Sequence, residues 1–345
     1  MRLRLMLVSL LAAFLAACSP APQHDYGGDI DAAHWQTFKR NFIHEDGRVV
    51  DVGNGNISHS EGQGYGMLLA VAANDRVTFD RLWTWTRTSL RRPDDALFAW
   101  RWQPDQAQPV SDMNNASDGE LLIAWALSRA ATRWSAASYR DEARTLARTL
   151  RDKLTRPTPH GLVLLPGIQG FEHPAGTTVN LAYWIFPAFR ELEHIDPSPA
   201  WRELRSSGEH LLRHARFGTP QLPPDWLLIA PDGRLQPAPS HPVRFGFDAL
   251  RIPLYACWGK VELPEFYAAV AAQWDSPNAP AWVDLDRGER APYPLTPGTQ
   301  AIHTLMQQCL SPPANPPITI DMPADNYYAS VLILLSQLAS QERAQ

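Results

Sequence analysis

The stretch Ser58-His59-Ser60-Glu61-Gly62-Gln63-Gly64-Tyr65-Gly66-Met67 continues without a break into Leu68-Leu69-Ala70-Val71-Ala72-Ala73. A segment that is apolar on every side is typical of a helix buried all round. Glu61 lies at its beginning, and the nearby glycines allow another group to approach the backbone closely. Glu61 is therefore a candidate functional carboxylate. Alternatively, Ser58 and Glu61 form a Ser-x-x-Glu capping box that only starts the helix.

Further segments show the same apolar character along the rest of the chain. Together with the first they fall near residues 61–73, 117–131, 179–192, 246–258, 297–309 and 327–339. Pro187 and Pro253 lie inside two of these segments and must kink or shorten the helices. No alternation of apolar and polar residues is long enough to predict a major sheet.

Segments with a single apolar face lie between these apolar helices. In residues 137–154 the apolar positions are Tyr139, Ala143, Leu146, Leu150 and Leu154, and in residues 31–43 they are Trp35, Phe38 and Phe42. Helices buried all round that alternate with helices buried on one face indicate a double ring. The sequence therefore predicts an all-α fold, an (α/α)6 barrel of six inner and six outer helices. Long Pro/Gly-rich connections at 156–176, 218–242 and 277–298 are expected to build a site.

The N-terminus predicts export from the cytoplasm. Basic residues, an apolar run and small residues before Cys18 make 1–18 an export signal, followed by a tether at 19–30 and a single domain at 31–345. Leu15-Ala16-Ala17-Cys18 resembles a lipoprotein signal, in which Cys18 would carry lipid; ordinary cleavage near Ala17 is the alternative. We expect a periplasmic protein, lipid-anchored at the outer membrane or free, with secretion as the alternative. No other stretch reaches the roughly 18 apolar residues of a membrane span.

Composition excludes several classes of function. A net charge of -5 and the absence of long basic runs argue against nucleic acid as a partner. No metal-ligand spacing, dinucleotide fingerprint or serine-nucleophile motif is present, so we expect no metal and no cofactor. Cys257 and Cys309 lie in apolar segments and are predicted to be buried thiols, although export would permit a disulfide.

Three carboxylates share one position in the predicted architecture. Glu61, Asp118 and Asp248 each lie near the start of an inner helix, and equivalent ends of inner helices face one rim. Each also has a structural interpretation: Asp118 would complement a helix N-terminus in a Ser117–Glu120 capping box, and Asp248 would pair with Arg251. Their shared position favours convergence on one cleft.

Two carboxylates in one cleft are what cleavage of a glycosidic bond requires, one to donate a proton and one to activate water or attack carbon. Glu61, in an apolar setting that would raise its pKa, suits the acid. Asp248, whose charged form Arg251 would favour, suits the base. Trp100, Trp102, Trp226 and Tyr327 would supply flat faces for sugar rings, although each is also a candidate core residue.

Four motifs carry a family resemblance. They are Ser60-Glu61-Gly62-Gln63-Gly64-Tyr65-Gly66-Met67, Asn115-Ala116-Ser117-Asp118-Gly119, Pro224-Asp225-Trp226 and Phe247-Asp248-Ala249-Leu250-Arg251. In this order they resemble glycoside hydrolase family 8, particularly the periplasmic endoglucanase encoded with bacterial cellulose synthases. The resemblance spans about residues 33 to 340. It implies an (α/α)6 barrel, an inverting mechanism and β-1,4-glucan as the substrate.

The resemblance also assigns roles by position. Glu61 matches the general acid, Asp248 the general base and Asp118 the acid that holds the sugar at the cleavage point. Tyr65 and Arg251 lie within the motifs and are expected to bind substrate. Val179-Asn180-Leu181-Ala182-Tyr183 aligns with a segment that usually reads Asn-Pro-Ser-Tyr, which implies site roles for Asn180 and Tyr183.

The sequence thus predicts a monomeric endo-β-1,4-glucanase that trims cellulose during export, with the cellulose synthase assembly as a further partner. Chitosan, xylan or mixed-linkage glucan are alternative substrates. A lipid-tethered glucan-binding or scaffold protein without catalysis is the alternative from another class.

Overall fold

The computed structural model describes residues 30–276, 278–310 and 318–344. The predicted export signal at 1–18, the lipidation site Cys18 and all but the last residue of the 19–30 tether lie outside the described residues. The described α-helices are α1 (Ala32–Phe42), α2 (Ser60–Ala72), α3 (Arg76–Ser89), α4 (Ser117–Arg133), α5 (Ala137–Leu154), α6 (Phe186–Ile195), α7 (Pro199–His214), α8 (Ile252–Trp258), α9 (Pro264–Trp274), α10 (Pro297–Leu310) and α11 (Tyr327–Ala344).

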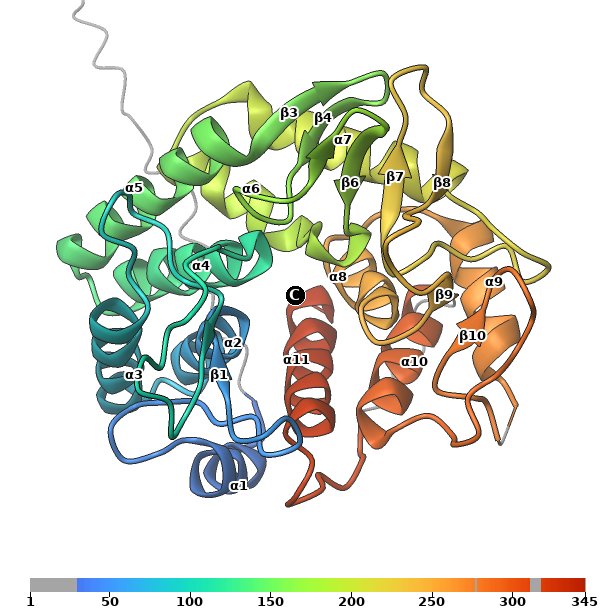
Figure 1. Ribbon diagram of the computed structural model, residues 1–345. Helices are drawn as coiled ribbons and strands as arrows, with labels where there is room; N and C mark the ends of the chain where they lie inside the picture. The colour runs from blue at the N-terminus through green and yellow to red at the C-terminus, as the bar shows by residue number, and fades with distance from the viewer. Residues whose placement is uncertain (1–29, 277, 311–317, 345) are drawn as a thin grey trace, which may run out of the picture.

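Six helices form an inner ring. In chain order α2, α4, α6, α8, α10 and α11 each pack against the next, and α11 closes the ring against α2 (Figure 1). The outer helices α1, α3, α5, α7 and α9 cover them, with α1 lying against α11. The predicted (α/α)6 barrel is confirmed. Five outer helices lie within the described residues, and residues 311–317, between α10 and α11, are outside them.

Burial follows the predicted pattern. Helices α2, α4 and α11 are buried on nearly every side, as their all-apolar sequences predict. In α5 the buried residues are the predicted stripe with Ala147 added, and in α1 they are Trp35, Phe38 and Phe42. In the described part of the chain, no helix combines the length and the apolar character needed to cross a membrane.

The two prolines shorten their helices. Pro187 and Pro253 occupy the first turns of α6 and α8, where a missing backbone N–H costs little. The predicted helix at 179–192 therefore begins only at Phe186, after the 3₁₀ turn Leu181–Tyr183. Likewise, the predicted helix at 246–258 begins at Ile252, after the 3₁₀ turn Ala249–Arg251. These irregular entries leave Asn180 and Asp248 at the ends of loops.

The long connections, which the sequence predicts to be loops, contain short antiparallel strands. Strands β5 (Glu172–His173), β6 (Gly176–Val179), β7 (Leu227–Ile229) and β8 (Leu235–Pro237) form a four-stranded sheet in that order. Three pairs accompany it: β1 (Ser58–His59) with β2 (Arg101–Trp102), β3 (Thr155–Thr158) with β4 (Gly161–Leu164), and β9 (Arg244–Phe245) with β10 (Val283–Asp284). Strands of two to four residues are too short to show a clear period of two.

Cys257 of α8 and Cys309 of α10 form a disulfide, with their Cα atoms 6.1 Å apart. The prediction of two buried thiols was therefore wrong. Each cysteine lies in an apolar helix, as expected, but α8 and α10 are neighbours in the inner ring. Their adjacency is a property of the ring closure, which the local sequence does not contain.

A buried ion cluster ties the inner helices together. Arg129 of α4 contacts Glu191 of α6 at 2.8 Å and Glu342 of α11 at 2.5 Å. Its guanidinium also lies over the Trp125 ring, while the Trp258 indole of α8 donates to Glu342. This one cluster thus connects four of the six inner helices, α4, α6, α8 and α11, and it fixes the position at which α11 packs.

Candidate active site

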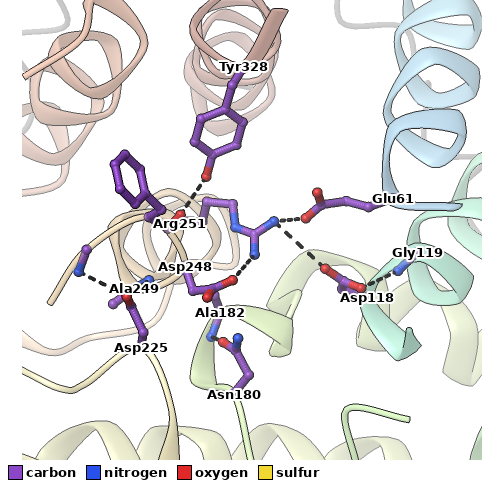
Figure 2. Close-up of polar contacts among 12 residues, drawn as sticks. Glu61, Asp118, Gly119, Asn180, Ala182, Asp225, Asp248, Ala249, Arg251 and Tyr328 are labelled. Atoms are coloured by element: carbon purple, nitrogen blue, oxygen red, sulfur yellow. Dashed lines mark hydrogen bonds and ion pairs between the residues drawn. The ribbon is translucent and has the colours of Figure 1, made fainter. Parts of the chain in front are cut away.

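Glu61, Asp118 and Asp248 line a single pocket. Glu61 lies in the first turn of α2, Asp118 in the first turn of α4, and Asp248 immediately before the 3₁₀ turn that leads into α8. The sequence placed these residues at equivalent helix starts, and the predicted convergence is confirmed. Figure 2 shows the three carboxylates arranged around one guanidinium.

That guanidinium belongs to Arg251. Its Nη2 lies 3.1 Å from Asp248 Oδ1, and its Nη1 lies 3.8 Å from Asp118 Oδ2. Nη1 also forms an ion pair with Glu61 (Figure 2). The Arg251 side chain is 5% exposed, so these contacts are little screened by water. Arg251 therefore contacts all three acids, whereas the sequence predicted a contact with Asp248 alone.

Glycines bring the starts of α2 and α4 together. A Cβ atom on Gly119 would lie 2.2 Å from Ser60 Oγ and 2.7 Å from the Glu61 backbone nitrogen. A Cβ atom on Gly64 would lie 2.5 Å from Leu122 Cβ. Any larger residue at these two positions would push the helices apart, so the glycines set the approach of Glu61 to Asp118.

The capping box proposed for Ser58 and Glu61 is not formed. Ser58 donates from Oγ to the Val49 carbonyl, and His59 is the N-cap residue of α2. Nδ1 of His59 accepts from the Gly62 backbone N–H at 2.9 Å. The Glu61 side chain is thus left to face the pocket.

The surroundings of Glu61 are polar, which corrects the predicted apolar setting. In addition to Arg251, the Tyr65 hydroxyl donates to Glu61 Oε1 at 3.2 Å. The same hydroxyl contacts the Tyr255 hydroxyl at 2.7 Å, below the pocket. The apolar residues that suggested a dry site come later in α2 and face the core, whereas the first turn faces the pocket.

Asp118 is almost fully buried. Burial raises its pKa to about 7, although the Gly119 N–H, which donates to Asp118 Oδ1 at 2.8 Å, favours the charged form. The N-cap residue of α4 is Ala116, which provides no side-chain cap, so the Ser117–Glu120 box is not formed either. Asp118 nevertheless lies at a helix N-terminus, so its structural and functional interpretations are compatible.

Asp248 differs from the prediction in its pKa. Burial, followed by the charges of Asp225 and Asp118, raises this pKa to about 7 despite opposing contacts from Asn180 and Trp226. The predicted contact with Arg251 is present, but the expectation of a favoured charged form left out burial, the charge of Asp225 and the raising effect of the predicted neighbour Asp118. With three acids around one cation, the group retains at least part of a proton near neutral pH.

The turn that carries Asp248 depends on Asp225, which the sequence analysis quoted in a motif but did not assign to the site. Asp225 Oδ1 accepts from the backbone N–H groups of Gly246 and Ala249, each at 2.9 Å. Its Oδ2 accepts from Arg244 Nε at 3.0 Å. Asp225 therefore fixes the backbone on both sides of Asp248. In the sequence, only the family motif Pro224-Asp225-Trp226 drew attention to this residue.

The predicted aromatic residues divide into two groups. Tyr183 and Tyr327 line the pocket together with Trp100. Trp102 does not line the pocket; its ring packs edge-on against Trp85 and lies under Arg48. Trp226 stacks on His241 with ring centroids 4.4 Å apart, so at least one of its faces is covered.

Two predicted residues lie behind the pocket wall. Tyr65 is buried and reaches the pocket through its hydroxyl, which donates to Glu61 and accepts from Arg251 Nη1 at 3.3 Å. Asn180 is also buried, and its Oδ1 accepts from the Ala182 N–H (Figure 2). Tyr255, His59 and Tyr328 contact or line the site and were missed by the sequence analysis; single aromatic or histidine residues carry no motif that would have distinguished them.

Comparison with known proteins agrees with this site. Residues 3–342 match the family described as Glycosyl hydrolases family 8. A probable endoglucanase of Novacetimonas hansenii is 38% identical over 332 residues, covering 95% of this chain and 94% of that protein. An endoglucanase of Cellulomonas uda is 40% identical over 279 residues, covering 79% of this chain and 76% of that protein.

Solved structures show the same likeness. Endoglucanase Cel10 from Klebsiella pneumoniae, a family 8 glycosyl hydrolase, superposes with a TM-score of 0.84 at 38% identity, covering 90% of this chain and 99% of that one. For endo-beta-1,4-glucanase CMCax from Acetobacter xylinum the TM-score is 0.82 at 36% identity, with 90% and 98% covered. The fold and these comparisons together define a glycoside hydrolase. Within that class, the chain belongs to glycoside hydrolase family 8.

Proposed function

We propose that this enzyme is an endo-β-1,4-glucanase that hydrolyses its substrate with inversion, with Glu61 as general acid and Asp248 as general base. The observation that carries the proposal is that three carboxylates surround one guanidinium in a single pocket. Such a group cannot be fully ionised at low cost, so it maintains one protonated and one charged acid. Glycoside hydrolysis needs that pair.

The chemistry follows from these positions. Glu61 donates its proton to the glycosidic oxygen as the bond from that oxygen to the anomeric carbon breaks. A water molecule attacks the anomeric carbon from the opposite side, and Asp248 accepts its proton. Asp248 acts as the base in its ionised form; its contact with Arg251 at 3.1 Å favours that form, whereas burial and the neighbouring acids raise its pKa to about 7. Proton exchange with solvent then restores both residues.

Among the other predicted site residues, those that line the pocket would bind the substrate. Asp118 is placed to hold hydroxyl groups of the sugar at the cleavage point, and Tyr183, Tyr327 and Trp100 line the walls. Several relatives are named endoglucanases, which favours a β-glucan over the alternatives. A panel of carboxymethylcellulose, chitosan, xylan and mixed-linkage glucan tests this choice, and we expect the highest kcat/KM on the first.

The decisive experiment compares Glu61→Gln, Asp248→Asn and the wild type on carboxymethylcellulose by release of reducing ends. We expect each substitution to lower kcat by roughly 10³-fold, with the thermal unfolding midpoint unchanged, since general acid–base groups typically contribute about 10²–10⁴-fold. Asp232→Asn removes an exposed acid paired with Arg234 and serves as the control. Wild-type turnover by Glu61→Gln would refute the assignment.

Two further measurements separate the alternatives. NMR of the first products on cellohexaose should show the α-anomer, because inversion of a β-linkage yields it. A non-catalytic scaffold protein would instead bind cellulose without releasing reducing ends and would not respond to the acid-to-amide changes.

We also propose, from the family resemblance, that the enzyme acts as a periplasmic or lipid-tethered monomer that trims cellulose during its export. Mass spectrometry of the mature N-terminus tests lipidation of Cys18, and light scattering tests the monomeric state. Recovery of an unmodified N-terminus beginning after Cys18 would exclude the lipid anchor.

A further inference from the structure

His59 is a pocket residue with an unusual structural role. Its Nδ1 caps α2 by accepting from the Gly62 N–H at 2.9 Å. Helix caps are usually Ser, Thr, Asp or Asn, which provide the same acceptor with a smaller side chain. Capping alone does not require an imidazole ring at this position. The His59 ring lines the pocket beside Glu61.

The cap fixes the protonation pattern of the ring. Because Nδ1 accepts a hydrogen bond, it carries no proton, and the proton of the neutral ring lies on Nε2. Nε2 faces Asp51 Oδ2 at 3.7 Å, on the loop that precedes α2. The lone pair of Nδ1 is thus on the side of Glu61, and the N–H is on the side of Asp51.

The two oxygens of Glu61 have different surroundings. Oε1 accepts from Tyr65 at 3.2 Å and pairs with Arg251, so a proton on that oxygen would oppose both donors. Oε2 lies 3.8 Å from His59 Nδ1. Oε2 is therefore the oxygen on which the acidic proton is favoured, and the His59 ring is the group beside it.

The ring is held in place by its neighbours. A Cβ atom on Gly62 would lie 3.1 Å from His59 Cε1 and 2.7 Å from the Tyr327 hydroxyl, so glycine is required beside the imidazole. The edge of the His59 ring packs against Tyr327, with ring centroids 5.9 Å apart at 73°. Contacts from α2 and α11 thus leave the imidazole little freedom to rotate.

We propose that His59 is a positioning residue that orients Oε2, the proton-bearing oxygen of Glu61, toward the glycosidic oxygen. The imidazole ring, held by the helix cap, by Tyr327 and by Asp51, limits the directions in which Oε2 can point. This inference rests on the proposed role of Glu61 as general acid.

The test separates the ring from the cap. His59→Ala removes both, whereas His59→Asn restores the cap, because Asn is among the best N-cap residues. On cellohexaose we expect His59→Asn to keep the wild-type unfolding midpoint and KM within twofold while kcat falls about tenfold, as a misplaced acid loses part of a 10²–10⁴-fold contribution. His303→Asn alters a partly buried histidine that pairs with the exposed Asp275 and does not line the pocket; it is the matched control and should leave kcat unchanged.

Full recovery of kcat in His59→Asn would overturn the proposal, because the residue would then be only a helix cap. Wild-type kcat in His59→Ala would overturn it as well.

If both variants fail to fold, Asp51→Asn decides: it leaves the cap intact but removes the carboxylate facing Nε2. A severalfold loss of kcat there supports the proposal and no loss overturns it. Failure of the acid assignment itself is detected separately, by wild-type activity of Glu61→Gln.

Discussion

Arg251 and Asp248 lie one turn apart and in contact, with Nη2 and Oδ1 separated by 3.1 Å, and the same guanidinium reaches Glu61 on another helix. The carboxylates of Glu61 and Asp248 therefore share one cation. Movement of a proton onto either carboxylate changes the attraction that Arg251 exerts on the other. The site behaves as a coupled unit and not as independent acids.

Arg251→Lys should lower kcat roughly 10²-fold, comparable with removal of one preorganised donor in other enzymes. A lysine keeps the positive charge but concentrates it on one nitrogen, so it lacks the planar fork with which Arg251 reaches Asp248 through Nη2 and Glu61 through Nη1. Steady-state kinetics on carboxymethylcellulose provide the measurement. Arg234→Lys, on an exposed arginine paired with Asp232, is the control. Equal kcat for Arg251→Lys and the wild type would show that bridging is unnecessary.

Asp225→Ala should impair both stability and catalysis. It removes the acceptor for the Gly246 and Ala249 N–H groups, and each buried donor left unpaired costs about 1–3 kcal/mol. Because these groups flank Asp248, we expect kcat to fall as well. Asp225→Asn retains the acceptor and should recover most of the stability in urea unfolding. Identical unfolding curves for the alanine variant and the wild type would contradict this role.

The free energy of unfolding should fall as the pH rises from about 5 to 8. Glu120 is fully buried, and burial raises its pKa to about 8, so the folded state retains a proton that the unfolded chain loses near its ordinary pKa. This stability is present at low pH and is lost as the pH rises through about 8. Burial opposes ionisation of Asp75, but hydrogen bonds, chiefly from Lys39, lower its pKa to about 2, so its contribution to stability is constant above about pH 4 and is lost only as the pH falls from there toward 2.

Urea midpoints measured between pH 5 and 8 check this dependence, and Glu120→Gln, which cannot ionise, should show a weaker slope. An unchanged slope in that variant would assign the effect to other groups, such as Asp118.

Removal of the Cys257–Cys309 disulfide should cost about 2–4 kcal/mol of unfolding free energy, because the cross-link closes a long loop in the unfolded chain. We expect the double alanine variant to unfold at lower urea and to be insensitive to reductant. The wild type should approach the same midpoint when reduced. Equal midpoints for the oxidised wild type and the variant would mean that the bond contributes no stability.

Much of the fold was predictable because burial leaves a local signature. Helix α5 matched its predicted range because apolar residues recur there at helical spacing. The acids converged as expected because Glu61 and Asp118 begin neighbouring inner helices, and that position is visible in sequence. The short strands were missed because two to four residues carry too little pattern.

Local periodicity and residue order were sufficient to predict the double ring of helices, the rim on which the acids lie and the family motifs. The tertiary structure alone decided that Arg251 serves three carboxylates, that Trp100 and not Trp102 lines the pocket, and that Cys257 meets Cys309. It also decided the raised pKa of Asp248. Coulomb energy, burial and bonding depend on distances between segments far apart in the chain, and these distances exist only once the ring has closed.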